Sequence, residues 1–337
     1  MKQFFLIIIL IFFVFQISAQ ESETDSSRFF QMSFAYPLST NGIDSMSYTN
    51  NISLNFLYGL NGGLKGFEVG TLFNYNRGSV SGFQLSGIAN INTGITNGVM
   101  LSGVANVLND SSNGFIFSLL FNYLAQDSRG VEISVANISQ GQSIGIQFGF
   151  LNCAKKHDGL QLGIINYSGD ADSGSSIGLF NIVKGGLYEL EFTSGDVLYF
   201  GANYKMGRDS FYSTFKFGAS LYNRKPVLST GIGLGGNVLF SEKSFLSIDI
   251  SANQIIYNLA LSNNMNLLSK LDLNYNFRFT EQLGILIGPS FNVYVCKEQV
   301  NGEYGTLLVP YSLYTCDLDD GVVKSWIGLN LGLTVRF

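Results

Sequence analysis

The residues best suited to acid–base or metal chemistry are few and lie in turn-like segments. The only histidine, His157, belongs to the charged run KKHD (155–158), which is more typical of a solvated turn than of a general base. The acidic segment GDADSG (169–174) lacks the spaced ligands and final glutamate of a calcium loop. No HExxH, CxxC or P-loop pattern occurs. The sequence therefore predicts no enzyme, no cofactor and no metal site.

The three cysteines suggest a single candidate cross-link. Cys296 and Cys316 lie in one long segment near the C-terminus, where an oxidising exterior would allow them to pair. Sequence does not give the distance between them, so the disulfide remains one of two alternatives. We expect Cys153, at the end of a repeat, to be an inert small residue.

The N-terminus and the composition predict export to a membrane. Residues 4–15 form an apolar run after Lys2, and small residues at 17–19 favour cleavage, so we expect a signal peptide over 1–19 and a polar segment over 20–27. The chain is 46% hydrophobic and only 13% charged. No later segment resembles a membrane-spanning helix, which leaves a closed β-barrel as the main way to place this apolar surface. A net charge of −5 without a basic patch makes nucleic acid an unfavourable partner.

A unit of 14 to 16 residues recurs eight times between residues 66 and 181. Each copy begins with glycine and ends with asparagine, as in GFEVGTLFN (66–74), GFQLSGIAN (82–90) and GLQLGIIN (159–166). Apolar second and fourth positions alternate with a polar third position and a Gly or Ser fifth position. This period of two predicts strands with one apolar face and one small, polar face.

The polar face of the repeats carries the candidate lumen residues. We predict that five polar side chains line a barrel interior and disfavour anions there: Glu68, Gln84, Glu132, Gln147 and Gln161. A polar wall without any selective role is the alternative. Copies with Met100, Ile116 or Ser175 depart from the pattern, so the third position is not an essential site.

Strand-like segments flank the repeats on both sides. They cover 28–37 and 50–60 before the repeats, and 187–192, 197–205, 210–223, 227–240, 244–258, 267–279, 282–295 and 322–337 after them. With one strand per repeat, the fold class is all-β: an antiparallel up-and-down transmembrane β-barrel of about 18 strands (16–20). We expect a single barrel domain over 28–337, with a repeat region at 66–181 and C-terminal barrel strands at 187–337. The longest connections, 38–49, 259–266 and 296–321, are the first, fifteenth and seventeenth along the chain. All three numbers are odd, which predicts that these connections are extracellular if the first strand runs outward from the periplasm.

The last strand, WIGLNLGLTVRF (326–337), alternates apolar and small or polar residues and ends on Phe337. A terminal aromatic is similar to the signal read by the bacterial barrel-assembly machinery, which we expect as a transient partner. The segments TNNISLNFLYGLNGGLKGFEVG (49–70), the repeats and GLFNIVKGGLYELEF (178–192) resemble the surface-repeat outer-membrane β-barrel proteins of Gram-negative bacteria. This resemblance covers about residues 30–337. It implies outer-membrane or cell-surface placement and brings no catalytic residues.

Three functional interpretations follow for an outer-membrane protein in contact with lipid. The first is a passive, porin-like channel for small polar solutes, because 16–18 strands enclose an aqueous lumen. The second is a surface structural or adhesion protein that presents 38–49 and 296–321 to an unknown ligand. The third changes the fold: eight copies would stack as a β-solenoid with the asparagines in a ladder at the corners.

Overall fold

The computed structural model describes residues 26–337 apart from 223–224, 260–263, 301, 306 and 308, so the predicted signal peptide and most of the polar segment lie outside the described residues. The described chain is built from β-strands, with one short 3-10 helix, η2 (Gly42–Ser47). It divides into two compact units, one ending at Gln126 and one beginning at Asp127. No helix among the described residues is long and apolar enough to cross a membrane.

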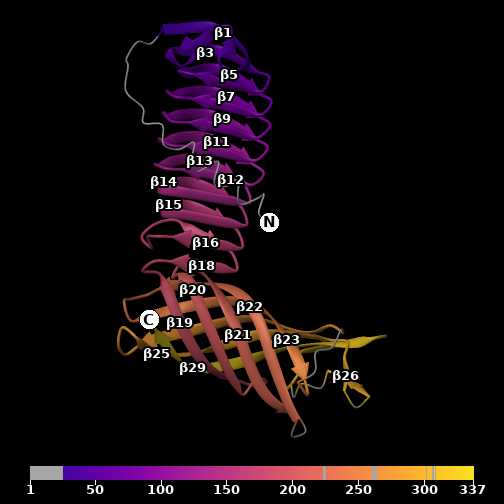
Figure 1. Ribbon diagram of the computed structural model, residues 1–337. Helices are drawn as coiled ribbons and strands as arrows, with labels where there is room; N and C mark the ends of the chain where they lie inside the picture. Colours follow the sequence, from indigo (N-terminus) through magenta and orange to yellow (C-terminus); the bar gives the residue numbers. More distant parts are fainter. Residues whose placement is uncertain (1–25, 223–224, 260–263, 301, 306, 308) are drawn as a thin grey trace. The chain divides into compact units, whose positions relative to one another are not determined.

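The first unit is a stack of parallel coils (Figure 1). Its strands are β1 (Ser26–Ala35), β2 (Leu38–Ser39), β3 (Tyr48–Asn55), β4 (Tyr58–Asn61), β5 (Gly63–Gly70), β6 (Phe73–Asn76), β7 (Val80–Ser86), β8 (Ala89–Asn92), β9 (Thr96–Ser102), β10 (Ala105–Leu108), β11 (Ser112–Ser118) and β12 (Phe121–Leu124). Each repeat supplies two strands: β5, β7, β9 and β11 stack on one side, and β6, β8, β10 and β12 stack on the other.

This pairing corrects the predicted fold of the repeats. Equivalent residues of successive copies face each other in parallel, so Gly66 pairs with Gly82 and Asn74 with Asn90. The prediction of one antiparallel barrel over 28–337 was therefore wrong for the repeats, and the solenoid alternative describes them. Residues 38–49 contain β2, η2 and the start of β3, so they are not a barrel connection.

The first glycine of each copy is required by close stacking of the coils. Gly82 has a φ of 145°, a region that L-residues avoid. A Cβ placed on Gly82 would overlap the carbonyl oxygen of Gly66 in the coil before it. The motif begins with glycine because only glycine allows the backbones to approach at these positions.

The second unit begins with coils of the same kind. Its coil strands are β13 (Ser128–Ile133), β14 (Ala136–Phe148), β15 (Leu151–Leu162), β16 (Ile165–Ser168), β17 (Ser175–Ile177) and β18 (Phe180–Val183). The shorter copies keep their asparagines in register, because Asn152 pairs with both Asn137 and Asn166. The residue that they lose belongs to the turn between the two sides of the coil, so every asparagine stays on the inside.

The C-terminal part of the second unit is a closed antiparallel barrel of eight strands. They are β19 (Leu187–Gly195), β20 (Phe200–Arg208), β21 (Phe211–Tyr222), β22 (Lys225–Leu239), β23 (Ser244–Tyr257), β24 (Asn266–Arg278), β25 (Leu283–Cys296) and β29 (Gly321–Arg336). Pairing of β19 with β29 closes the sheet. The connection between β25 and β29 holds β26 (Gln299–Val300), β27 (Glu303–Tyr304) and β28 (Tyr314–Leu318).

The eight strand-like segments predicted after the repeats correspond to these barrel strands. Their alternation has the predicted sense: in β29, Leu329 and Leu331 are exposed while Asn330 is buried. The short turns 209–210, 240–243 and 279–282 lie at the barrel end where β19 begins and β29 ends. The described parts of the two longest connections, 258–265 and 297–320, lie together at the opposite end, where the Lys297 N–H donates to the Met265 carbonyl at 2.7 Å.

Candidate functional site: two buried polar interiors

The five predicted lumen residues lie inside the coils instead of a barrel. Glu68, Gln84, Gln147 and Gln161 have no solvent exposure, and Glu132 is 3% exposed. In the first unit the Glu68 carboxylate accepts hydrogen bonds from four amide groups: Asn55 Nδ2 (2.9 Å), Asn61 Nδ2 (2.5 Å), Asn76 Nδ2 (2.7 Å) and Gln84 Nε2 (2.7 Å). The polar face therefore points inward as predicted, but it encloses its own hydrogen-bond network and no lumen.

Burial and hydrogen bonding act in opposite directions on Glu68. Loss of water raises the pKa of its carboxyl above the usual value, and the amide donors of Gln84, Asn76 and Asn55 partly offset this. In the second unit Glu132 accepts from Ser128 Oγ at 2.6 Å and from Gln147 Nε2 at 2.9 Å. Both carboxylates are satisfied by side chains of their own coil and of neighbouring coils, which is typical of a structural polar core.

The copies without a polar third position are explained by a matching change across the coil. Gln84 exchanges hydrogen bonds with Asn92, the residue two places after the conserved asparagine. In the next two coils both partners become apolar together, and Leu64, Val80, Met100, Leu108, Ile116 and Leu124 form a buried hydrophobic cluster. The third motif position and the residue two places after the asparagine therefore change together. A hydrogen-bonded polar pair can be replaced by an apolar pair without leaving a buried polar group unsatisfied. Sequence reasoning missed this, although residues 76, 92, 108 and 124 carried the signal.

The repeat asparagines form a hydrogen-bonded ladder in each unit. In the first unit Asn74 Nδ2 donates to Asn90 Oδ1 at 2.9 Å, and Asn90 Nδ2 donates to Asn106 Oδ1 at 2.9 Å. In the second unit Asn152 donates to Asn166 at 2.9 Å, and Asn166 to Asn181 at 2.8 Å. This ladder was predicted for the solenoid alternative, and each rung fixes the register between coils.

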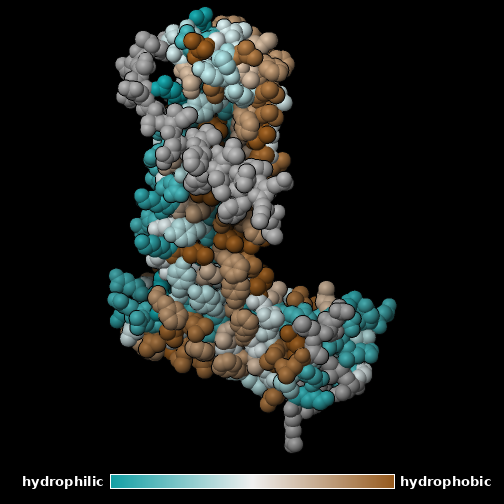
Figure 2. Space-filling view, in the orientation of Figure 1, coloured by the Kyte–Doolittle hydropathy of each residue, from teal (hydrophilic) through white to brown (hydrophobic). Residues whose placement is uncertain are grey.

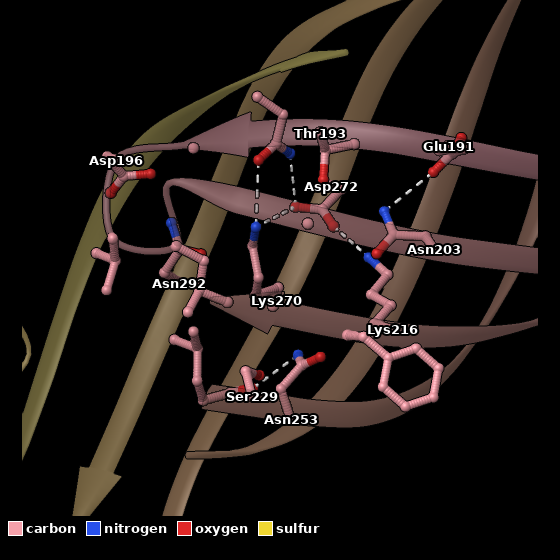
Figure 3. Close-up of a pocket in the computed structure, with 18 of the residues that line it drawn as sticks. Glu191, Thr193, Asp196, Asn203, Lys216, Ser229, Asn253, Lys270, Asp272 and Asn292 are labelled. Carbon is pink, nitrogen blue, oxygen red and sulfur yellow. Dashed lines mark hydrogen bonds and ion pairs between the residues drawn. The ribbon is translucent and has the colours of Figure 1, made fainter. Parts of the chain in front are cut away.

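The barrel interior is filled by buried ion pairs (Figure 3). Lys216 Nζ lies 2.6 Å from Asp272 Oδ2, and Lys270 Nζ lies 3.4 Å from Asp272 Oδ1. Deeper along the same interior, Lys205 Nζ lies 2.6 Å from Glu191 and 3.1 Å from Asp249. Lys205 and Lys216 therefore meet carboxylates that come from other strands, whereas Lys270 pairs with Asp272 of its own strand, β24.

A second group of charges lies at the short-turn end of the barrel. Arg336 donates to both carboxylate oxygens of Asp209, at 3.2 and 2.8 Å. Arg278 lies 3.7 Å from Glu189 and 3.9 Å from Asp209. With the lysines above, five basic side chains face five acidic ones in this interior. These ten charges balance one another, and the Asp196 carboxylate, which also faces the interior, accepts a hydrogen bond from Trp326 Nε1.

The opposite end of the barrel is closed by a hydrophobic cluster. It contains Val197, Val227, Ile255, Tyr257, Leu268, Tyr294, Cys296, Leu307, Val322 and Trp326. Leu307 comes from the long connection, so this connection packs into the barrel mouth. The cavity between the cluster and the ion pairs has a volume of about 40 Å³ and is lined by Lys270, Asp272 and Trp326 among others. This volume holds a few water molecules.

The predicted disulfide is absent, and the sheet gives the reason. Cys153, Cys296 and Cys316 are all free thiols. Cys296 of β25 pairs with Val322 on one edge of β29, whereas Cys316 of β28 pairs with Val323 on the other edge. Two cysteines separated by an intervening strand lie about 9–10 Å apart, beyond the reach of a disulfide. The candidate cross-link was therefore wrong.

His157 is a buried residue of β15 and not the solvated turn residue that we predicted. It has no solvent exposure, and the acidic segment 169–174 packs against it, with Ser173 Oγ donating to the His157 carbonyl at 3.1 Å. Burial, reinforced by the nearby Arg208 guanidinium, lowers the pKa of His157 to about 4. Among the described residues, no group of three or more His, Cys, Asp or Glu side chains is placed to hold a metal ion.

Comparison with known proteins does not identify a family. No protein-family model matches the chain, and no curated protein matches it. Among solved structures, the chain is similar to the Yersinia pestis outer membrane protein Ail in a phospholipid bilayer nanodisc. That match has 11% identity, covers 45% of this chain and 99% of the Ail chain, and has a TM-score of 0.26. A TM-score of this size does not establish a shared fold.

Proposed function

We propose that the protein is a structural protein of the outer membrane, in which the barrel is a lipid-embedded anchor and the coils are the domain that it holds. The outer side of the barrel carries the observation on which this depends. Ile250 of β23 is 62% exposed, and Leu329, Leu331 and Leu333 of β29 are 56–59% exposed, while their neighbours in sequence point into the charged interior. Figure 2 shows apolar side chains, in brown, over part of the outer side of the barrel. A closed sheet with this polarity suits a bilayer.

The barrel interior favours an anchor over the predicted channel. The ion pairs of Lys205 with Asp249 and of Lys216 with Asp272 cross the interior, and the cluster around Trp326 fills the mouth. Eight strands enclose a space that side chains can fill completely. We therefore expect no conductance above the lipid background in planar bilayers. A stable, ion-selective conductance would overturn this part of the proposal.

The positions of the turns imply an orientation. Bacterial barrels place short turns in the periplasm and long connections outside. The coils end at Val183, just before β19, at the end with the short turns. In the proposed orientation the second unit's coils adjoin the periplasmic end of the barrel, and the connection 297–320 is outside the cell.

Thiol labelling of intact cells tests both placement and orientation. Cys316 in the outer connection is partly exposed, and Lys155→Cys in a Cys153→Ser chain adds a thiol on the coils. A membrane-impermeant maleimide is expected to label Cys316 in intact cells and the coil thiol only after the outer membrane is permeabilised. Equal labelling of both sites in intact cells would refute the orientation, while recovery of the chain outside the membrane fraction would refute the anchor.

A charge on the lipid-facing side of the barrel provides a matched test of the anchor. Ile250→Lys places a cation on the most exposed face of β23 and should cost about 2–4 kcal/mol if the site lies near the bilayer centre. A folded outer-membrane barrel is expected to migrate differently on a gel before and after boiling, and this heat-modifiable band should weaken in the variant. Gln140→Lys, on an exposed coil turn, is the control and should leave the band unchanged.

A second candidate function, binding of a surface partner, is favoured by the outer connection. Tyr311, Leu313 and Tyr314 are 50–59% exposed there, and aromatic residues are enriched at protein interfaces. The double variant Leu313→Ser, Tyr314→Ser should reduce adhesion of cells that display the protein without changing its heat-modifiable band. Unchanged adhesion would remove this candidate.

A further inference from the structure

The outward side chains of the second unit's coils form a continuous apolar surface, which we call the coil face. Its members are exposed hydrophobic residues on both sides of the coils and on the turns that join the two sides. Ile146 and Phe148 of β14 lie on one side, Tyr167 of β16 with Phe180 and Ile182 of β18 lie on the other, and Val135, Phe150 and Ile164 lie in the turns. Their neighbours in sequence, including Gln147 and Asn181, are buried inside the coil. This polarity is the reverse of a water-soluble solenoid, which buries apolar side chains and exposes polar ones.

The edge of the coils away from the coil face is polar. Lys155, Lys156, Gln140 and Asp172 are exposed there, and Lys156 pairs with Asp170 at 3.5 Å. Figure 2 shows teal side chains on one side of these coils and brown ones on the other. The coils are therefore amphipathic, with one surface suited to water and one suited to an apolar environment.

The coil face runs directly into the outer surface of the barrel. Phe180 of β18 stacks on Phe215 of β21, with ring centroids 5.4 Å apart. Phe215 lies on the same side of its strand as Phe217, which is 57% exposed. The last coil also covers Ser213 on that side, because Asn181 Nδ2 donates to Ser213 Oγ at 2.7 Å. The two apolar surfaces are joined without a polar boundary at this point.

We infer that the acyl chains of membrane phospholipids cover the coil face as well as the barrel. This inference rests on the proposed membrane anchor and extends it to the repeats. Lipid that surrounds β21 at Phe217 can continue over Phe215 and Phe180 without exposing an apolar edge to water. The polar edge at Lys155 and Lys156 remains available to water and headgroups. The protein is then a membrane anchor whose repeats also bind lipid.

Tryptophan quenching by phospholipids with brominated acyl chains tests the inference in the full-length protein in proteoliposomes. The native Trp326 is completely buried and gives a constant background. Three reporters are compared: Phe148→Trp on the coil face, Leu329→Trp on the outside of the barrel, and Lys155→Trp on the polar edge. Phe148→Trp and Leu329→Trp should each lose at least half of their added fluorescence, and Lys155→Trp should lose little. Phe150→Trp replaces Phe148→Trp if the latter fails to give a heat-modifiable band.

The outcomes separate the inference from the proposed function. Quenching of Leu329→Trp without quenching at Phe148 or Phe150 would overturn the lipid-covered coil face and leave the anchor intact. An unquenched Leu329→Trp would overturn the anchor. Cross-linking of two chains through Phe148→Cys, together with an unquenched reporter at that position, would assign the coil face to a second copy and refute lipid as its occupant.

Discussion

Replacing His157 with glutamine is expected to remove a large part of the pH dependence of the second unit's coils. The imidazole is fully buried in β15, and its pKa is lowered to about 4, first by burial and then by the Arg208 guanidinium. In the unfolded chain the same group has a pKa of about 6.5. The folded coil therefore resists protonation of this side chain, whereas the unfolded chain accepts the proton readily.

The sign and size of the effect follow from this difference. A basic group whose pKa is lower in the folded state does not reduce the free energy of unfolding at pH values above its pKa in the unfolded chain. As the pH falls from that value toward the pKa in the folded state, the free energy of unfolding decreases progressively. Between about pH 7 and pH 4, the wild-type coils should lose about 3 kcal/mol through His157 alone. His157→Gln, which does not titrate, should lack this loss.

Hydrogen exchange followed by mass spectrometry measures the effect locally. The opening free energy of peptides from residues 143–166 is compared at the two pH values, after correction for intrinsic exchange, in wild type and His157→Gln. Gln140→His in the His157→Gln chain is the control, because an exposed histidine at residue 140 should not restore the pH dependence. Parallel pH profiles of wild type and His157→Gln would refute the argument.

Three further substitutions test the coil stacking and the barrel interior. Gly82→Ala should lower the urea midpoint of the coils by the equivalent of about 2 kcal/mol or more, because the positive φ and close backbone contact of Gly82 exclude a Cβ. The control Gly185→Asn, at a glycine with a φ of 73° and open space around it, should cost only a few tenths of a kcal/mol. Equal effects of the two substitutions would contradict this explanation. Asn90→Ala removes one rung of the ladder and should cost about 2–3 kcal/mol in the same assay, so an unchanged midpoint would count against the ladder. Lys216→Met leaves Asp272 short of a partner and should cost about 3–5 kcal/mol, seen as a lower temperature for loss of the heat-modifiable band, and an unchanged temperature would refute the stabilising ion pair.

The C-terminal barrel was predictable because its strands are long and regular. In β29 the exposed Leu329, Leu331 and Leu333 alternate with inward-facing residues. From β19 to β25, each strand pairs with the strand that follows it in the sequence. Antiparallel neighbours joined by short turns need no information beyond the pattern itself. The outward direction of the alternating apolar positions was also predictable, in the repeats as well as in the barrel.

The partners of the repeat strands were not predictable by the same means. A period of two fixes which side chains share a face, but it does not distinguish a parallel neighbour from an antiparallel one. Each copy of the repeat also contains a turn that the alternation does not reveal. Gln84 belongs to β7 and Asn90 to β8, so one copy spans two strands. Counting one strand per copy therefore gave a barrel of about 18 strands, where the chain forms coils and a barrel of eight.

The sequence by itself determined that the chain is all-β, that the apolar second and fourth positions of the repeats face outward and that glycine and asparagine recur at fixed positions in each coil. These features are local, because alternation and backbone conformation depend on neighbouring residues alone. Only the tertiary structure decided that Glu68 and Glu132 are enclosed by amides and hydroxyls of adjacent coils, that Lys216 meets Asp272 across the barrel, and that β29 separates Cys296 from Cys316. These outcomes depend on which strands become neighbours, and strand partnership is set by the closure and stacking of the whole sheet.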